Sequence, residues 1–477
     1  MMIPENALNA EDVRGMMLDR MEKHLSLKTE GYRSTTNETF NLLLKAVGEG
    51  SSLEAVCADS WGVVDSNTLR EQVNTALPVT ALREQEAEMN AALQAAIPAG
   101  MPRGGLEVAI DTHDEPFYGK TAALRAYTCK TRAKAGTRRF FRIASAYVIW
   151  REVRLTLALT YVLPEDTLPE VAERLLLRLK QVGLHATVLY LDKGFCCGEI
   201  IGYLQRTQQA AVLACPIRGK QGGIRALCQG RGSLTTDYTF TDGTHARLAL
   251  VDTRVPVPKT KRKQRKWLAF VLVNLDWTPQ QVYRKYRRRF GIEASYRLLR
   301  QVKVLTNSRN PALRFFFLGL GLLMQNVWVL ARWLFTRRPG KGRHKLIPSL
   351  LRFDRFRKLL VRAVERFYPP PLAVAVFVSP ESVIHWILVI TPNREGRAGS
   401  QCRRRLLRFN RLPTPRAEHT PCRQSADLDT RELRIFRPKV AKDQTQGLTT
   451  DILRAASRCL SLDDLDTGLA AARYLKG

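Results

Sequence analysis

The spacing of apolar residues changes near position 105. In residues 1–100 short apolar repeats with few β-branched runs predict helices. Beyond them the pattern becomes that of strands, and three successive candidates are LEVAID (106–111), RRFFRIASAYVIW (138–150) and VRLTLALTYV (153–162). The last two are close enough in sequence to form a hairpin.

A helix and further strands are expected next. The segment LPEVAERLLLRLKQVG (168–183) is amphipathic and ends at a glycine, a common C-terminal stop. The nearly continuous apolar run ATVLYLD (186–192) is typical of a parallel strand that is buried on both faces. A short helix (199–206) and the strand AAVLACP (210–216) complete the pattern.

Three strands, a helix, a parallel strand, a helix and a strand follow one another in the ribonuclease-H-like fold. We therefore predict an α/β protein with a mixed sheet and flanking helices. In that fold the first and fourth strands lie side by side. Asp111 closes the first strand and Asp192 closes the fourth, so two carboxylates from distant segments are expected at one edge of the sheet.

The rest of the chain suggests several further regions. LEAVCADSWGVVDSNTLREQV (53–73) is compatible with a helix-turn-helix, with Ala58 in the first helix, Gly62 at the turn and Asp65 or Ser66 as the cap of the second. A plain two-helix packing unit explains it equally well. The expected domains are a helical region (1–100), a catalytic core in two parts (105–216 and 276–335), a β-rich insertion between them (217–275), a basic, partly helical C-terminal region (336–400), and a basic linker with a small helical end segment (401–477).

Two segments allow more than one interpretation. The basic run KTKRKQRK (259–266) fits a solvated hairpin tip, a DNA contact or a localisation signal. The apolar stretch from Phe315 to Leu330 is interrupted by Gln325 and Asn326, and we expect a buried core helix rather than a membrane span. The beginning of the chain lacks the pattern of a signal peptide, and nine cysteines without a Cys-x-x-Cys pair favour a reducing compartment, so a cytoplasmic location is expected.

Charge changes the picture most. The 477 residues include 76 Lys and Arg against 44 Asp and Glu, a formal net charge of +32. Residues 1–100 hold 8 basic and 15 acidic side chains, a net charge of −7, so residues 101–477 carry +39. The densest stretch, 281–366, has 22 basic side chains and three acidic ones. Such an excess favours a polyanionic partner, nucleic acid first of all.

One acidic residue of that stretch lies within a basic helix face. In YRKYRRRFGIEASYRLLRQVK (283–303), a helical period puts five side chains on one stripe and apolar residues opposite. The stripe consists of Tyr286, Arg289, Glu293, Arg297 and Arg300. Glu293 can pair with Arg289 and Arg297 four residues away. Five basic side chains between Arg284 and Arg289 would nevertheless repel one another without a nearby anion.

The spacing Tyr, two residues, Arg, three residues, Glu, six residues and a basic residue resembles the signature of DDE transposases of the insertion-sequence-four superfamily. Arg300 stands where that family usually has Lys, and Lys303 is one turn away. The segments AIDTHDEPFYGK (109–120) and YLDKGFCCGEI (190–200) resemble the regions of the family's two aspartates. SRNPALRFFFLGLGLLMQNVW (308–328) is similar to the apolar helix that follows the glutamate, so the resemblance spans about 105–335.

The resemblance implies that Asp111, Asp192 and Glu293 hold two Mg²⁺ or Mn²⁺ ions. Two such ions activate a water or a 3′-hydroxyl in phosphoryl transfer. Asp114, three residues after Asp111, remains an alternative first ligand. The family's DNA-contacting positions correspond to Tyr286, Arg289 and Arg300. Arg297 on the same stripe and Lys303 one turn beyond Arg300 are further expected DNA contacts.

The expected function is a transposase that cleaves transposon ends and joins their 3′-hydroxyls to target DNA, working as a homodimer on double-stranded DNA. A decayed or domesticated DNA-binding protein without catalysis, and a non-specific nuclease, are the alternatives.

Overall fold

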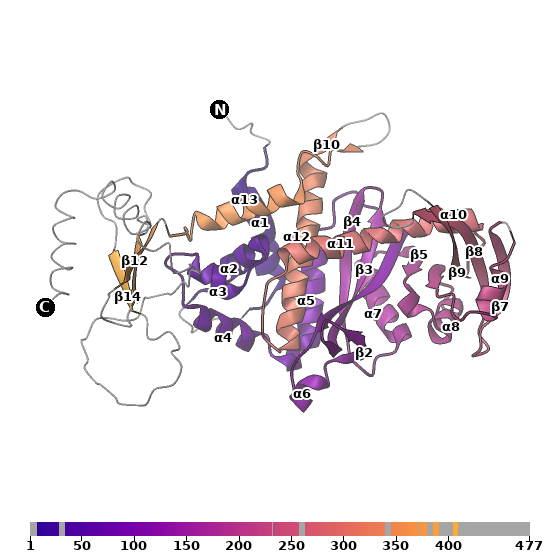
Figure 1. Cartoon of the computed structure of the whole chain (residues 1–477). Coiled ribbons are helices and arrows are strands. Elements are labelled where there is room, and N and C mark those ends of the chain that lie inside the picture. Colours follow the sequence, from indigo (N-terminus) through magenta and orange to yellow (C-terminus); the bar gives the residue numbers. More distant parts are fainter. Residues whose placement is uncertain are drawn as a thin grey trace. The chain divides into compact units, whose positions relative to one another are not determined.

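A computed structural model describes residues 7–27, 34–230, 232–256, 263–338, 345–371, 373–378, 385–390 and 404–408 (Figure 1). The chain divides into two compact units. The first consists of Met1–Cys57 and Val63–Phe367, and the second of Ala58–Gly62 and Tyr368–Gly477.

The N-terminal part of the first unit is helical, as predicted. Its helices are α1 (Ala10–His24), α2 (Thr36–Glu49), α3 (Leu53–Ala58), α4 (Ser66–Ala76) and α5 (Leu82–Gln94), with a 3₁₀ turn η1 at Val79–Ala81. Polar side chains cap the N-termini of three of these helices. Asn9 and Asp12 form a capping box at α1, Thr35 caps α2, and Asp65 caps α4. The two helices and the cap expected between residues 53 and 73 are therefore present, whereas DNA binding by them stays a prediction.

A large mixed sheet forms the centre of the first unit (Figure 1). Its core strands are β1 (Leu106–Pro116), β3 (Thr137–Trp150), β4 (Val153–Val162), β5 (Ala186–Leu191) and β6 (Ala211–Cys215). β1 runs antiparallel to β3 and parallel to β5, while β4 pairs with β3 and β6 runs parallel to β5. The predicted neighbourhood of the first and fourth strands is thus confirmed.

The connection from β1 to β3 contains two elements that the sequence pattern did not indicate. These are the short helix α6 (Ala122–Arg125) and the edge strand β2 (Cys129–Lys134), which pairs with the beginning of β3. β2 has one buried residue, Cys129, and no apolar alternation. Pairing with β3, rather than a buried face of its own, holds it in the sheet.

The segment expected as a β-rich insertion extends the same sheet. It contains α9 (Gly223–Leu227), β7 (Leu234–Thr239), β8 (His245–Pro256) and β9 (Lys263–Val273). β9 pairs antiparallel with β6, so the strand order runs β2-β3-β1-β5-β6-β9-β8-β7. Residues 263–266 of the basic run belong to β9, and the remainder of that run lies outside the described residues.

Helices cover both faces of the sheet. On one face α7 (Leu168–Gln181) and α8 (Gly198–Arg206) bury apolar side chains against the strands. On the other, α10 (Pro279–Tyr286) and α11 (Phe290–Val302) cover Ala109, Tyr190 and Val212. The alternation of side chains along β1 therefore places Ala109 and Asp111 on the face beneath α10 and α11.

Helix α12 (Pro311–Phe335) is the apolar helix expected around residues 315–330. By length and composition it is the one helix among the described residues that would be able to cross a membrane, but 89% of its apolar window is buried inside the protein. Its polar residues are used internally: Asn326 donates to the carbonyl of Thr156 at 2.7 Å and accepts from the amide of the same residue at 3.1 Å. This burial agrees with the predicted core helix.

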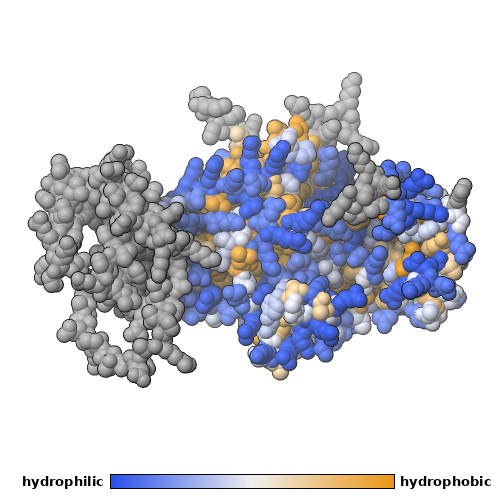
Figure 2. Space-filling model, viewed as in Figure 1, coloured by the Kyte–Doolittle hydropathy of each residue, from blue (hydrophilic) through white to orange (hydrophobic). Residues whose placement is uncertain are grey.

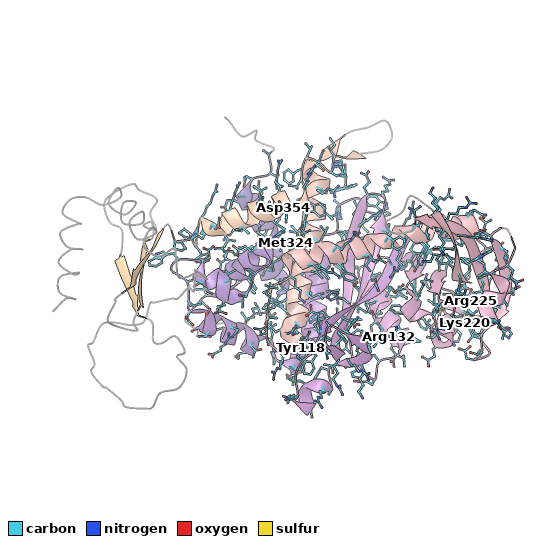
Figure 3. The ribbon with its side chains drawn as sticks, in the orientation of Figure 1. Tyr118, Arg132, Lys220, Arg225, Met324 and Asp354 are labelled. Carbon is cyan, nitrogen blue, oxygen red and sulfur yellow. The ribbon has the colours of Figure 1, made fainter. Side chains whose placement is uncertain are left out.

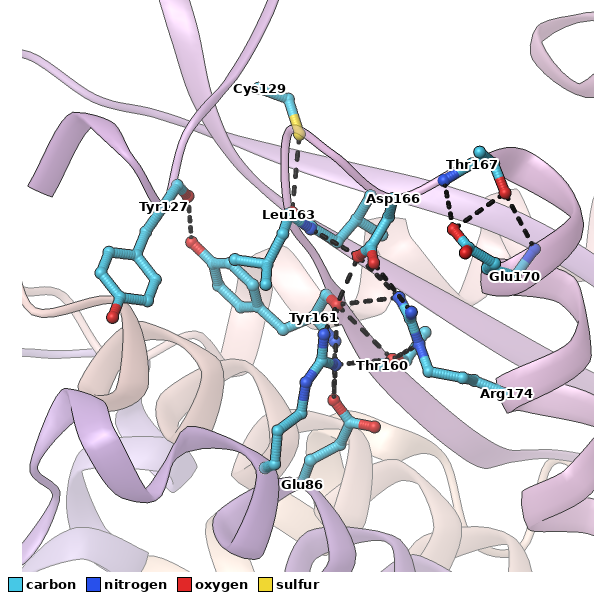
Figure 4. A network of polar contacts seen from close by, with 12 residues as sticks. Glu86, Tyr127, Cys129, Thr160, Tyr161, Leu163, Asp166, Thr167, Glu170 and Arg174 are labelled. Carbon is cyan, nitrogen blue, oxygen red and sulfur yellow. Dashed lines mark hydrogen bonds and ion pairs between the residues drawn. The ribbon is translucent and has the colours of Figure 1, made fainter.

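A polar network fixes the end of β4 against α5 and α7 (Figure 4). Glu86 of α5 accepts from the backbone amide of Tyr161 at 3.0 Å. Arg174 of α7 donates to both oxygens of Asp166, at 2.6 and 2.8 Å. Thr167 and Glu170 form the capping box that begins α7. These contacts anchor the strand at the side of the core remote from β9.

The C-terminal part of the chain departs from the expected helical pattern. In the first unit, α13 (Phe353–Glu365) packs on α1 and α2, and β10 (Arg337–Arg338) pairs with β11 (Lys345–Leu346). The second unit contains an antiparallel sheet of β12 (Ala373–Val378), β13 (His385–Ile390) and β14 (Arg404–Arg408). Residues 404–408, expected in a linker, form a strand because they pair with β13. The predicted helical end segment lies outside the described residues.

Candidate active site

Three carboxylates come together on the face of the sheet that α11 covers. Asp192 directly follows β5, as predicted, and Glu293 lies in the first turn of α11. Asp111 does not close its strand as predicted, because β1 stays paired with β3 as far as Pro116, five residues further on. The parallel register pairs Ile110 with Leu191, so the residues that follow them, Asp111 and Asp192, are neighbours. The structure thus brings together the three residues that the sequence selected as metal ligands.

The guanidinium of Arg289 lies between these carboxylates. Its Nη2 is 3.0 Å from Oδ2 of Asp111 and 3.4 Å from Oδ1 of Asp192, and its Nη1 is 3.0 Å from Oε1 of Glu293. The Arg289 side chain is only 4% exposed, while those of Asp192 and Glu293 are 44% and 48% exposed. One buried cation therefore partly neutralises three acidic groups, two of which face solvent.

Burial governs the electrostatics of Asp111. Desolvation raises the pKa of Asp111 to about 6, although Arg289 and the amide of Thr112 act in the opposite direction. The negative charges of Asp192 and Glu293 raise it further. Burial acts to lower the pKa of Arg289, but Tyr286 and the three carboxylates together raise it, so its charge is retained. An additional cation beside Asp111 would favour its ionised form.

The 3₁₀ turn η3 (Arg287–Arg289) places this arginine. The sequence predicted one continuous helix from Tyr283 to Lys303, but the structure has α10, then η3, then α11. Arg288 donates to both carboxylate oxygens of Glu107 at 2.8 and 2.9 Å. Arg289 donates to Asp111, which lies four residues after Glu107 in β1. These two contacts dock the turn on the sheet, which explains why the helix is interrupted here.

The predicted stripe of polar side chains is accordingly divided. Tyr286 and Arg289 are buried together with Ile292, whereas the predicted stripe placed them opposite it. The Tyr286 hydroxyl donates to the carbonyl of Leu191 at 2.9 Å, and its ring packs against Phe270 at 4.8 Å. In this arrangement Tyr286 holds the end of β5 beside Asp192, and its predicted contact with DNA stays a prediction.

The other predicted DNA-binding residues of α11 differ in exposure. Arg297 and Arg300 are exposed. Lys303, directly after the helix, is 2.6 Å from the buried Glu115, which is also 3.3 Å from Arg314. Lys303 is therefore engaged in an ion pair with a buried carboxylate, so Arg300 is the more accessible of the two alternative basic positions.

Asp114 is placed away from the trio. It accepts from Arg142 through both oxygens, at 2.8 and 3.2 Å, and from Lys134 at 2.8 Å. Its position three residues after Asp111 puts it on the opposite face of β1. These ion pairs lower the pKa of Asp114 although burial alone would raise it. This geometry favours Asp111 over Asp114 as the first ligand.

The sequence did not single out two residues beside the site. Glu115 lies on the face of β1 that carries Asp111, and Tyr296 of α11 hydrogen-bonds Ser145 of β3 with an oxygen–oxygen distance of 2.6 Å. Alternation along the strand, at 111, 113 and 115, was the signal available for Glu115. Nothing in the local sequence indicates the Tyr296 contact, because it joins segments 151 residues apart.

A cleft of about 770 Å³ opens beside the carboxylates and extends along β9. Asp192 and Glu293 contribute to its acidic part. The rest of its lining is largely basic and aromatic and includes Lys193, Arg225, Arg265, Lys266, Trp267, Tyr283, Arg287 and Phe290. Phe290 is half exposed, so an aromatic face is accessible close to Glu293. Basic side chains attract a polyanion and aromatic side chains stack on planar rings, so this lining is suited to a ligand that has both.

The donor set fits hard divalent cations. Carboxylate oxygens are the ligands that Mg²⁺ and Mn²⁺ prefer, and here three such groups from separate elements converge. They already surround one positive group, the Arg289 guanidinium. Its Nε is buried without a hydrogen-bond partner among the described residues, so part of this arginine's bonding capacity is unused.

Comparison with known proteins gives little further information. No family model and no curated protein matches the chain. Among solved structures, it is similar to a chain in the cryo-EM structure of the piggyBac transposase synaptic complex with hairpin DNA. The two are 11% identical, the match covers 75% of this chain and 76% of that one, and the TM-score is 0.45. These values are too low to establish a common fold.

Proposed function

We propose that this protein is a DNA transposase of the insertion-sequence-four type. It cleaves the ends of a mobile element by metal-dependent phosphodiester hydrolysis and joins the 3′-hydroxyl ends to target DNA. The observation that carries the proposal is the convergence of Asp111, Asp192 and Glu293 around the buried guanidinium of Arg289. The strand order β4-β3-β1-β5-β6 and its strand directions support a ribonuclease-H-like core.

Asp111, Asp192 and Glu293 would hold two Mg²⁺ or Mn²⁺ ions. When bound, these ions activate the attacking water or hydroxyl and stabilise the leaving oxygen during in-line transfer. The exposed faces of Asp192 and Glu293 leave their oxygens accessible from the cleft, while β1 holds Asp111 at a fixed position beneath them.

Arg289 links DNA binding to this site. Its guanidinium occupies the oxygens that the cations require, so it must release at least one carboxylate before the site is loaded. A DNA phosphate offers it an alternative anionic partner, with which arginine forms strong charge-assisted hydrogen bonds. Arg297 and Arg300 on the exposed surface of α11 extend the basic path for the DNA backbone.

Two protomers act together in the proposed reaction, because a mobile element has two ends. The cleft along β9 receives the DNA end, with basic side chains along the backbone and aromatic rings beside the bases. The protein acts on DNA in the cytoplasm of a prokaryotic cell.

The decisive experiment is cleavage of a duplex that carries the inverted repeats flanking the gene. Asp111→Asn, Asp192→Asn and Glu293→Gln should each abolish Mg²⁺-dependent cleavage and strand transfer while DNA binding is retained. Equal cleavage of a scrambled duplex, without strand transfer, would instead indicate a non-specific nuclease.

A DNA-binding protein without catalysis is the second candidate. The observation that favours it is that Arg289 forms ion pairs with all three carboxylates. This candidate predicts sequence-specific binding to the inverted repeats with no cleavage in Mg²⁺ or Mn²⁺. The same assay therefore separates the two candidates.

A further inference from the structure

The connection between β1 and β3 is strongly basic. Residues 117–139, FYGKTAALRAYTCKTRAKAGTRR, contain seven Lys and Arg and no Asp or Glu. They comprise α6, β2 and the beginning of β3, and we call them the basic ribbon. β1 continues five residues past Asp111 before the ribbon begins, which is about 17 Å along an extended strand. The basic ribbon is thus distinct from the candidate active site.

The geometry of the basic ribbon is well defined. Lys134 pairs with Thr137, and the two residues between them, Ala135 and Gly136, have φ values of 52° and 74°. Positive φ at both positions is the conformation of a tight type I′ hairpin turn. The Tyr118 hydroxyl donates to the carbonyl of Ala135 at 2.7 Å, which ties the beginning of the ribbon to its turn. Figure 3 shows Tyr118 and Arg132 in the region of α6 and β2, apart from Arg225 on the insertion.

Five basic side chains of the ribbon are exposed and form no ion pair within the described part of the chain: Lys120, Arg125, Lys130, Arg132 and Arg138. The other two are engaged, because Lys134 pairs with Asp114 at 2.8 Å and Arg139 donates to Thr128 at 3.2 Å. Asp114 and Arg142 form the ion pair at the base of the ribbon. The carboxylate of Asp114 is therefore already paired where the ribbon joins the sheet. The five exposed basic side chains of the ribbon have no acidic partner among the described residues.

This arrangement has an electrostatic cost. Lys130 lies directly opposite Arg139 on the neighbouring strand, and like charges in that position destabilise a sheet. A solvated charged surface normally mixes both signs, which keeps such repulsion small. Here no acidic side chain of the ribbon relieves it. An external anion that contacts several of these cations together would do so.

We propose that the basic ribbon binds the phosphate backbone of double-stranded DNA. A two-stranded β-ribbon fits the major groove, which is about 12 Å wide, and β2 is about 20 Å long. A lipid surface fits less well, because interfacial segments present an apolar face. Among the large apolar side chains of the ribbon, Tyr118 is exposed, at 65%, whereas Phe117 is buried. The part of the first unit seen in Figure 2 is likewise mostly hydrophilic.

The experiment compares two triple variants of the full chain. In the ribbon variant, Lys130, Arg132 and Arg138 are changed to Gln. In the control variant, Arg178, Lys180 and Arg206 on α7 and α8 are changed to Gln, which removes the same charge. Binding of a fluorescent 40-base-pair duplex of arbitrary sequence is measured in EDTA from 50 to 300 mM salt, so that the carboxylate site plays no part. Equal melting temperatures verify that both variants are folded.

The ribbon variant should bind at least tenfold more weakly at 0.1 M salt than the control. Each lost phosphate contact reduces the slope of log affinity against log salt by about 0.9, so a reduction of 2 to 3 is expected in the ribbon variant alone. Hydrogen exchange of residues 129–140 should slow when the duplex binds.

Equal losses in both variants would overturn the proposal, because they would show an effect of bulk charge. Unchanged duplex binding together with lost binding to phosphatidylserine vesicles would overturn it in favour of a membrane contact. Ribbon-dependent binding in a protein that never cleaves DNA would leave this proposal standing and refute the transposase function, so the two can fail separately.

Discussion

Arg289 donates through Nη2 to Oδ2 of Asp111 at 3.0 Å, across 178 positions of sequence. This contact joins the turn before α11 to the central strand of the sheet. Because Arg289 also contacts Asp192 and Glu293, it holds the three carboxylates close together despite their mutual repulsion. Its removal should therefore have opposite effects on folding and on cation binding.

We expect Arg289→Gln to lower the free energy of unfolding by about 3 kcal/mol without divalent ions, since it removes the buried guanidinium that pairs with Asp111 and with the half-exposed Asp192 and Glu293. Mn²⁺ should bind at least tenfold more tightly than to the wild type, because the carboxylates lose their internal cation. Electron paramagnetic resonance of free Mn²⁺ measures the affinity, and Arg287→Gln, from the same turn, is the control. An unchanged Mn²⁺ affinity in Arg289→Gln would contradict the competition between arginine and metal.

Asp111 and Asp114 should separate function from stability. Asp111→Asn is expected to abolish Mg²⁺-dependent DNA cleavage with little loss of stability, because burial already disfavours its charge. Asp114→Asn should cost about 2 kcal/mol, since it weakens the ion pairs with Arg142 and Lys134, and should leave cleavage intact below the melting temperature. Urea denaturation and a cleavage assay provide both readouts. The reverse pattern would make Asp114 the ligand.

Tyr286→Phe tests whether this residue supports β5. Loss of the hydrogen bond to the Leu191 carbonyl should cost about 1 kcal/mol in urea denaturation and weaken Mn²⁺ binding through movement of Asp192. Tyr283→Phe is the matched control, because its hydroxyl contact, with Thr253, is a long 3.5 Å. If Tyr286→Phe changed DNA affinity alone, its hydroxyl would instead contact the substrate.

Glu115 should make stability depend on acidic pH. Burial acts to raise its pKa, but His113, Lys303 and Arg314 surround it, and the pKa falls to about 2. The ionised form therefore stabilises the fold above the unfolded value of about 4.3, and this contribution is lost as the pH falls toward 2.

Wild-type protein should accordingly lose on the order of 3 kcal/mol more than Glu115→Gln between pH 5 and pH 2. At pH 7 the variant should be less stable than the wild type. Parallel slopes of stability against pH for the two proteins would contradict this assignment.

The sequence predicted the core of the sheet because its strands are long and their apolar pattern is set by burial. The order of the strands was enough to predict that Asp111 and Asp192 are neighbours, and Asp192 does follow the end of β5. The predicted strand end at Asp111 was wrong, because pairing with β3 extends β1 to Pro116. Strand β2 could not be predicted in this way, since it lies at an edge and has one buried residue. β2 is held in the sheet by backbone pairing with β3, and such pairing does not require alternating apolar and polar side chains in residues 129–134.

The role of Arg289 was also beyond the sequence. Periodicity placed it on a polar helix face, and its spacing from Glu293 suggested a surface ion pair. Its burial depends on Asp111 and Asp192 reaching the same point from two strands, a long-range convergence. Similarly, the pattern of residues 217–275 indicated strands but gave no sign that β9 would pair with β6.

That last pairing limits how the protein can open. β6 and β9 share an antiparallel ladder from Ala211–Val273 to Cys215–Ala269, and β9 also forms one wall of the cleft. Hinge rotation of this wall away from the carboxylates would break consecutive backbone hydrogen bonds in the middle of the sheet. β9 and the end of β5 that precedes Asp192 are therefore held in register by one continuous hydrogen-bonded sheet through β6.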